Sequence, residues 1–283
     1  MTIAPKCHFC DACDGHGCVG ELPGMGGVFD NANFIENVAA WARYSSEGPM
    51  PRLRLAPITG AQQNVGYEEE GPFYFDLVDA CASAGIALSI GDGYPDEKIK
   101  HGIEALRRAG KKGAVFIKPY PNARIEERME WARDVAEIVG VDIDSYNIVT
   151  MRNLANLERK SAADLAALRA RTRVPFAVKG VCTDEDVELV RELKPDVVVV
   201  SNHGGRVETR RGSTADFLAA RGKELARHAG AVWVDGGLRS RSDLLAAGAL
   251  GAAEAMVARP LITALLRGGA LTVRSRVAEF LGK

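Results

Sequence analysis

Residues 196–206 read Asp-Val-Val-Val-Val-Ser-Asn-His-Gly-Gly-Arg, and this stretch indicates the architecture of the chain. The β-branched run from Val197 to Val200 is typical of a parallel strand that is covered on both faces. It leads into a loop that carries a titratable imidazole, His203, and a fixed cation, Arg206, with two glycines between them. A buried strand that delivers polar side chains to a loop is the building unit of α/β proteins.

The same unit recurs from residue 52 onward. Apolar runs predict strands at residues 52–58, 86–90, 114–118, 141–144, 175–179, 196–201, 231–235 and 254–257. Amphipathic stretches predict helices at residues 76–84, 95–109, 125–139, 162–171, 184–193, 214–228 and 241–250, and Pro260 opens a last helix. Thr183 and Asp186 have the spacing of a capping box. This alternation predicts an α/β fold, a (β/α)8 TIM barrel, with a doubly wound open sheet as the competing arrangement.

Composition excludes several classes of function. The chain has 283 residues, of which 47% are hydrophobic and 26% charged, with a net charge of −1. This balance predicts a globular protein without the electrostatic field that attracts nucleic acid or an anionic membrane. The longest apolar runs are strand-sized, so no membrane span is expected, and we expect a cytoplasmic protein. Residues 52–283 are predicted to form the barrel, and residues 1–51 a Cys-rich extension and capping segment.

Four of the six cysteines crowd into one short segment, at Cys7, Cys10, Cys13 and Cys18. In a reducing compartment such spacing favours a metal, either tetrahedral zinc or an iron–sulfur cluster. The alternatives are free thiols, opportunistic disulfides and redox-active thiols. Cys81 and Cys182 stand alone and are expected to be buried as small apolar side chains.

The predicted strand ends carry the candidate site, because catalytic groups of barrels gather where the strands end. Histidine exchanges protons near neutral pH, and arginine binds a carboxylate with paired hydrogen bonds. His203 and Arg206 therefore predict a site that holds a small acid and removes a proton from it. The seventh strand runs into two glycines and Arg239, and Arg259 follows the eighth, which indicates a phosphate cradle.

Four motifs in this order and spacing resemble the FMN-dependent 2-hydroxy-acid oxidase and dehydrogenase family, namely Lys179-Gly180, Ser201–Arg206, Asp235–Arg239 and Arg259-Pro260. The resemblance covers residues 174–269 and extends through residues 52–145 by way of Pro57, Ser89 and Tyr120. It implies FMN as cofactor and oxidation of a small 2-hydroxy acid to the 2-oxo acid. It also implies a homo-oligomer and an electron acceptor, either a small molecule or a partner protein.

The resemblance implies a role for each matching residue. His203 is the expected general base, Arg206 binds the substrate carboxylate, and Lys179 lies near the flavin N1–O2 edge, with Tyr120 completing the catalytic set. The cofactor is expected to contact Pro57, Ser89, Lys118, Lys179, Ser201, Asp235, Gly236, Gly237, Arg239 and Arg259.

The chain also departs from the pattern of that family. Family members are usually longer, and they have a glutamine where Lys118 precedes Tyr120. A second carboxylate-binding arginine has no clear match, with Arg152 as a candidate, and neither has an N-terminal substrate-contacting tyrosine. Three alternatives therefore stay open: an FMN-dependent non-redox isomerase, a redox enzyme for a different acidic substrate, and a metal-binding degenerate barrel.

Overall fold

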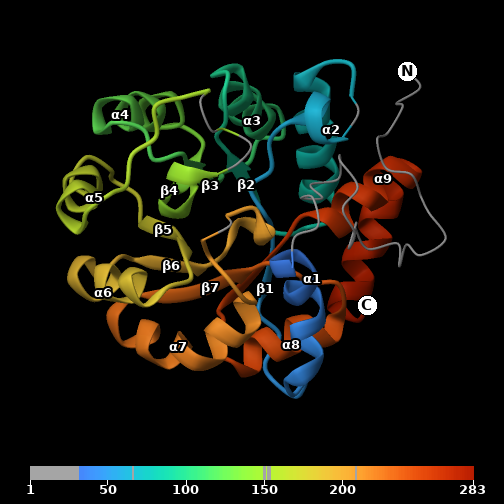
Figure 1. The fold of residues 1–283 in the computed structure, drawn as a ribbon. Helices are drawn as coiled ribbons and strands as arrows, with labels where there is room; N and C mark the ends of the chain where they lie inside the picture. The colour runs from blue at the N-terminus through green and yellow to red at the C-terminus, as the bar shows by residue number, and fades with distance from the viewer. Residues whose placement is uncertain (1–31, 66, 149–150, 152–153, 208) are drawn as a thin grey trace.

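The protein is described by a computed structural model that covers residues 32–65, 67–148, 151, 154–207 and 209–283. In these residues eight parallel strands lie side by side in the order β1-β8-β7-β6-β5-β4-β3-β2. The amide of Leu55 donates to the carbonyl of Ala87 at 2.8 Å, which joins β1 to the segment entering β2. The sheet is therefore closed, as Figure 1 shows, with helices around it. The predicted (β/α)8 barrel is confirmed, and the open sheet is excluded.

The elements follow one another in strict alternation. The strands are β1 Arg52–Leu55, β2 Ser89–Gly91, β3 Gly113–Ile117, β4 Ala136–Asp142, β5 Phe176–Val181, β6 Val197–Val200, β7 Ala231–Asp235 and β8 Glu254–Val257. The α-helices are α1 Ala32–Ala39, α2 Glu70–Ser83, α3 Glu97–Arg108, α4 Asn122–Trp131, α5 Ala162–Arg169, α6 Asp184–Leu193, α7 Thr214–His228, α8 Arg241–Ala249 and α9 Arg259–Leu281. Shorter helical turns are η1 Ala40–Arg43, η2 Ala61–Val65, η3 Ile143–Asn147 and η5 His203–Gly205.

Most predicted boundaries hold to within a few residues, but three do not: α2 begins at Glu70 where the prediction had residue 76, β4 begins at Ala136 where it had residue 141, and α4 ends early. Helix α6 begins after the predicted capping box, in which the Asp186 amide donates to Thr183 Oγ1 at 3.2 Å. The helix predicted at residues 125–139 was wrong at its end, because α4 ends at Trp131 and β4 begins at Ala136. Val135, Ile138 and Val139 have a helical spacing, but pairing of β4 with strands on both sides overrides it.

The barrel interior is a separate apolar core. It contains Ala56, Ala114, Phe116, Ala177, Val197, Val199, Trp233 and Met256, all of them buried. Along a strand every second residue points inward, so each of these side chains shares its face with the residue two positions further on. Near the amino-terminal ends of the strands Arg54 closes the interior, with its guanidinium 4.6 Å from the Trp233 ring and 2.5 Å from Glu254. The interior is a packed plug, so the open space lies above it, at the carboxyl ends of the strands.

Candidate active site

The inward face of the barrel changes from apolar to charged at the carboxyl ends of the strands. Lys118, Lys179 and Asp235 each lie two residues beyond an interior side chain, after Phe116, Ala177 and Trp233 respectively. Asp142 occupies the corresponding place at the end of β4. Strand alternation therefore gathers two ammonium groups and two carboxylates into one layer directly above the apolar plug.

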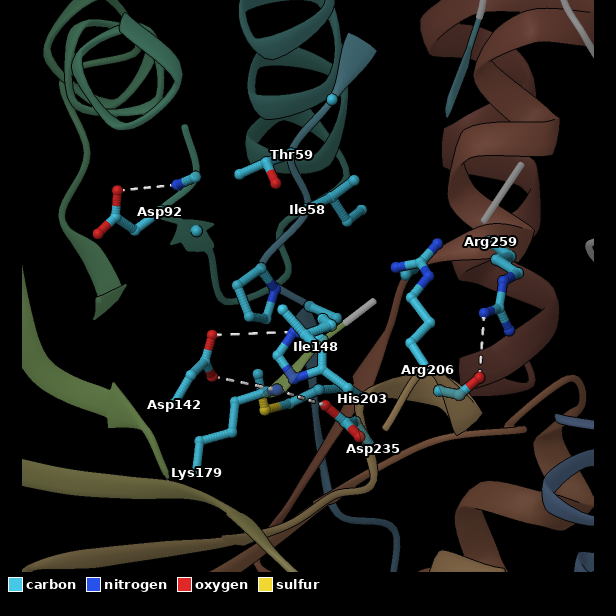
Figure 2. A pocket seen from close by; sticks show the side chains of 18 of the residues that line it. Ile58, Thr59, Asp92, Asp142, Ile148, Lys179, His203, Arg206, Asp235 and Arg259 are labelled. Carbon is cyan, nitrogen blue, oxygen red and sulfur yellow. Dashed lines mark hydrogen bonds and ion pairs between the residues drawn. The ribbon is translucent and has the colours of Figure 1, made fainter. Parts of the chain in front are cut away.

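A cavity opens above this layer and encloses about 1280 Å³ of space that reaches solvent. Ten of the predicted site residues line it: Pro57, Lys118, Lys179, His203, Arg206, Asp235, Gly236, Gly237, Arg239 and Arg259. Figure 2 shows His203 and Lys179 on one side of this space and Arg206 and Arg259 on the other.

Three predicted site residues do not line the cavity. Ser201 lies beneath it, and its hydroxyl accepts a hydrogen bond from Lys179 Nζ at 3.2 Å. The Tyr120 ring is buried beside the guanidinium of Arg128, at 4.3 Å. Ser89 is buried in β2. Ser201 therefore supports the floor of the cavity, whereas Tyr120 and Ser89 are buried outside its lining, each with a hydroxyl that has no hydrogen-bond partner among the described residues, and their predicted roles stay predictions.

Asp142 joins the two lysines of the floor. Its carboxylate lies 2.8 Å from Lys118 Nζ and 3.3 Å from Lys179 Nζ. Lys179 also lies 3.4 Å from Asp235. Burial alone would raise the pKa of Asp142, but the charges of Lys118 and Lys179 outweigh burial and lower that pKa. Burial likewise opposes the charge of Lys179, yet Asp142 and Asp235 raise its pKa above the ordinary value. The floor is a charge-paired network, and we assign no metal to it.

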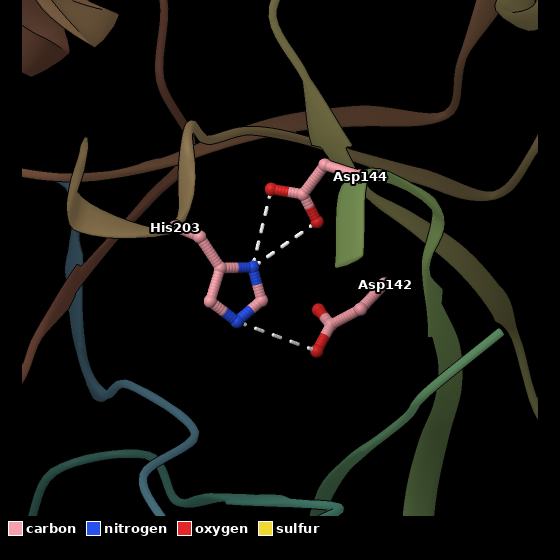
Figure 3. Close-up of side chains that lie close together, drawn as sticks. All are labelled: Asp142, Asp144 and His203. Atoms are coloured by element: carbon pink, nitrogen blue, oxygen red, sulfur yellow. Dashed lines mark hydrogen bonds and ion pairs between the residues drawn. The ribbon is translucent and has the colours of Figure 1, made fainter. Parts of the chain in front are cut away.

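A buried carboxylate orients the imidazole of His203. Both oxygens of Asp144 lie 3.1 Å from His203 Nδ1, as Figure 3 shows. A carboxylate only accepts hydrogen bonds, so Nδ1 carries a proton and Nε2 keeps its lone pair. Burial and the charge of Lys118 lower the pKa of His203 below 6.5, against the opposing effect of Asp144. His203 is therefore a neutral imidazole at pH 7 with a defined tautomer, which is the state a general base requires.

The backbone that carries His203 is strained and is held from outside. His203 has φ +58°, and Gly204 and Gly205 follow with +65° and +86°. A non-glycine residue in this region persists only where its surroundings fix it. The Gly205 amide donates to the Asn202 side chain at 3.1 Å, and Asn202 accepts from Asn37 Nδ2 at 2.8 Å. Helix α1, which carries Asn37, thereby fixes the loop.

Arg206 carries a guanidinium with no counter-ion among the residues that the structure describes. Among the described residues no side chain forms an ion pair or hydrogen bond with its guanidinium, which is half-buried and lines the cavity. Burial lowers its pKa to about 10, so the group stays charged at neutral pH. A buried cation without a partner costs free energy, and an anionic ligand removes that cost. The guanidinium is therefore suited to bind a carboxylate that enters the cavity.

The loop after β7 has the backbone shape of an anion cradle. Gly236 and Gly237 adopt φ +94° and +77°. A Cβ atom on Gly237 would lie 1.8 Å from the carbonyl oxygen of Asn37, so only glycine fits beside α1. The indole of Trp41 donates to the Gly236 carbonyl at 2.9 Å and fixes the loop from the same side. Arg259 reaches the cavity from the start of α9, where its guanidinium stacks 3.8 Å from the Phe34 ring.

Four residues that shape this site were not assigned a role in it from the sequence. Asp142 and Asp144 stand at a predicted strand end, but charges at strand ends often only pair with one another, so they were weaker candidates. Asn202 lies inside the quoted motif, next to His203. Asn37 had no sequence signal, because its role depends on where α1 packs.

The predicted burial of Cys81 and Cys182 is confirmed. Cys7, Cys10, Cys13, Cys18 and Arg152 lie outside the described residues, so their predicted roles stay predictions. Among the helices that the structure describes, none combines the length and the apolar character that a membrane span needs.

Fold and cavity together define a (β/α)8-barrel protein with a charged, glycine-bordered site at the carboxyl ends of its strands. The sequence pattern of the FMN-dependent dehydrogenase family matches residues 107–282, well over half of the chain. The protein therefore belongs to that family, and the family resemblance read from the sequence is confirmed.

Individual relatives match over shorter stretches. The chain is 38% identical to 2-hydroxyacid oxidase 2 of Rattus norvegicus over 107 residues, which span 36% of this chain and 29% of the relative. It is 29% identical to the L-lactate oxidase of Lactobacillus jensenii over 189 residues, 62% of this chain and 45% of that enzyme. The matched stretches thus span less than half the length of these two relatives.

The structural similarity to solved proteins covers more of the chain than the sequence matches do. The crystal structure of mandelate oxidase with (S)-2-phenylpropionate superposes with a TM-score of 0.70, covering 95% of this chain and 85% of that one at 22% identity. At this level of identity the likeness shows the shared barrel.

Proposed function

We propose that this protein binds FMN and oxidises a small 2-hydroxy acid to the corresponding 2-oxo acid. The observation that carries the proposal is the pairing, in one cavity, of a neutral histidine with a fixed tautomer and an arginine that has no counter-ion within the described part of the chain. A 2-hydroxy acid offers both matching groups, since its carboxylate suits Arg206 and its hydroxyl suits His203 Nε2. Relatives named 2-hydroxyacid oxidase and L-lactate oxidase support the same substrate class.

In this proposal the chain's own residues bind, orient and accept a proton. Arg206 binds the substrate carboxylate, and His203 Nε2 accepts a proton from the substrate while Asp144 stabilises the resulting imidazolium. Lys179 places a permanent positive charge beneath the reacting groups, because Asp142 and Asp235 keep it protonated. Bound FMN supplies the two-electron oxidation chemistry that no side chain provides.

The cavity fits FMN by the chemistry of its walls. Asp235 Oδ1 is buried and has no hydrogen-bond partner within the described part of the chain, so it can accept from a ribityl hydroxyl. The positive-φ glycines after β7 and the side chains of Arg239 and Arg259 are the groups that would hold the phosphate. Lys179 would face the flavin ring from the floor. These residues agree with the cofactor contacts expected from the sequence.

The visible spectrum of the purified protein, followed during anaerobic mixing, tests this proposal. Addition of lactate, glycolate or mandelate should bleach the flavin band, and acetate, which has no hydroxyl group, should not. Arg206→Met should keep the flavin spectrum but slow the bleaching. Admission of air then shows whether oxygen or another acceptor reoxidises the flavin. A colourless protein that takes up no FMN, or a flavin that no 2-hydroxy acid bleaches, contradicts the proposal.

A further inference from the structure

Lys118 occupies the position from which a substrate hydroxyl would have to approach His203. Its ammonium nitrogen lies 3.0 Å from His203 Nε2 and 2.8 Å from Asp142 Oδ2. The side chain comes from the end of β3 and is buried, with 5% of its surface exposed. The contact between Lys118 and His203 is therefore part of the buried floor of the site and is not a contact between exposed side chains.

The hydrogen-bond chemistry of this contact has one consistent assignment. An ammonium group only donates, so Nε2 of His203 must be the acceptor. This assignment agrees with the tautomer already inferred, in which Nδ1 carries the proton and donates it to Asp144 on the other side of the ring. Both nitrogens of the imidazole are thus engaged, one by a carboxylate and the other by a lysine. The lone pair that a general base needs is already occupied when no substrate is present.

We propose that Lys118 is a positioning residue that acts through His203, covering Nε2 between turnovers and keeping the imidazole neutral. This inference rests on the proposed role of His203 as the base. In the family that the sequence resembles, glutamine is usual at this position, so the cation is a property of this chain.

The charges around His203 show why Lys118 has this influence. The imidazole faces Asp144 from η3, Asp142 from β4, Lys118 from β3 and Lys179 from β5. Lys118 is the cation in direct contact with the ring and also pairs with Asp142, while Lys179 pairs with Asp142 and Asp235. A positive charge at contact distance opposes a second positive charge on the imidazole. Burial and Lys118 therefore act together to keep the base unprotonated at neutral pH.

The same charge has a consequence when the substrate arrives. The substrate hydroxyl must replace the Lys118 N–H as the donor to Nε2, and its proton then forms the new N–H bond of an imidazolium. That cation would repel the ammonium 3.0 Å away, and Asp142 is the group toward which Lys118 can withdraw. Asp142 remains a counter-ion for both lysines, so no charge is left without a partner.

Three substitutions separate the charge of Lys118 from its hydrogen bond. Lys118→Met removes both, Lys118→Gln retains a neutral donor, and Lys118→Arg retains the charge. Asp142 keeps its ion pair with Lys179 at 3.3 Å in all three, so no buried carboxylate loses its only partner. Gln is also the conservative choice if the Met variant folds poorly.

The pKa of His203 in the FMN-bound protein is the direct measurement, made by NMR titration of histidine-labelled protein with the His203 signal assigned through His203→Asn. We expect Lys118→Met and Lys118→Gln to raise this pKa by about one unit or more, since a contacting cation is removed. Lys118→Arg should stay within about half a unit of the parent. Met and Gln variants that titrate within about 0.3 unit of the parent overturn the inference.

The pH profile of kcat/KM is the second readout, and its acid limb should move in the same direction as the NMR pKa. The two proposals fail in different ways. A flavin that no 2-hydroxy acid reduces contradicts the proposed function, while the NMR titration still tests Lys118. An active oxidase in which removal of the Lys118 charge leaves the pKa of His203 unchanged contradicts only the inference about Lys118.

Discussion

At the scale of single residues, the state of His203 determines how activity should depend on pH. The base must be unprotonated, and burial together with Lys118 places its pKa below 6.5. We therefore expect kcat/KM to rise with pH through an acid limb below 6.5 and to be level at neutral pH. An acid limb centred above pH 7 would show that another group is the base.

One neighbouring carboxyl group requires a control for that profile. Asp92 also lines the cavity, and burial raises its pKa to about 6. Its Oδ2 accepts from Arg128 Nε at 3.0 Å and from the backbone amide of Lys118 at 3.2 Å. Asp92→Asn should leave the acid limb in place, whereas a limb that disappears in this variant belongs to Asp92.

Arg206 should contribute to substrate binding and not to cofactor binding. A charge-assisted hydrogen bond contributes about 1.5–3 kcal/mol, so Arg206→Met should lower kcat/KM by roughly 10- to 100-fold. The FMN content should stay unchanged, because Arg206 is not among the expected cofactor contacts. Steady-state kinetics with lactate and mandelate measure the loss of kcat/KM, and the flavin absorbance of the purified variant measures its FMN content.

The exposed residue Arg227 provides the matched control for this substitution. It lies in the last turn of α7, outside the cavity. Arg227→Met removes the same charge from the molecule and should leave kcat/KM within twofold. Equal losses in the two variants would mean that net charge, and not the contact with the carboxylate, is responsible.

Residues whose expected role follows from their type and their spacing along the chain were predictable from the sequence. Lys179 lies near the end of an apolar strand, and His203 and Arg206 follow the next one, so all three meet at the carboxyl end of a barrel. Asp144 was less predictable, because a carboxylate at a strand end has many possible partners until the loop conformations are known. Asn37 was not predictable at all, since its three hydrogen bonds depend on the packing of α1 against loops more than 160 residues away.

At the scale of elements, α1 acts as a brace on the loops that form the site. Asn37 donates to Asn202 Oδ1 at 2.8 Å and accepts from the Thr214 amide at 2.9 Å. Asn37→Ala leaves both groups buried without this partner, which should lower the free energy of unfolding by about 1–3 kcal/mol. The loop that carries His203 should also loosen, so kcat should fall. Urea unfolding and steady-state kinetics measure the two effects.

Glu36 provides a control on the same helix. Its side chain is partly exposed and pairs with Arg43, which is more exposed. Exposed ion pairs contribute about 0–1 kcal/mol, so Glu36→Ala should change the stability much less than Asn37→Ala does. If both variants lose the same stability, α1 contributes through its helix as a whole and not through the asparagine.

The elements themselves were predictable where local and tertiary preferences agree. Helix α6 has a capping box, an amphipathic pattern and a left-handed Lys194 at its end, and its predicted bounds are the observed ones. The segment from α4 to β4 is the opposite case. Its apolar spacing suits a helix, and only the hydrogen bonds from β3 and β5 convert its second half into a strand.

At the scale of the whole molecule, the proposed cofactor would connect parts that are distant in sequence. Lys179 lies in β5, Asp235 ends β7 with the two glycines directly after it, and Arg259 lies at the start of α9. Helix α1 packs against the loops after β6 and β7, so these loops are already braced on one side. A ligand held by all these segments should stabilise the folded barrel as one cooperative unit.

Comparison of FMN with riboflavin tests how much of that stabilisation comes from the phosphate and how much from the rest of the cofactor. Because only FMN has a phosphate, FMN should raise the Tm of protein stripped of cofactor more than riboflavin does at equal concentration. A ligand at 100 times its Kd adds about 2.7 kcal/mol, which corresponds to a rise of several degrees for a chain of this size. Arg259→Met should reduce the FMN effect and leave the riboflavin effect unchanged, because Arg259 would meet the phosphate and not the ring. Equal stabilisation by the two flavins would place the phosphate outside the cradle after β7 and β8.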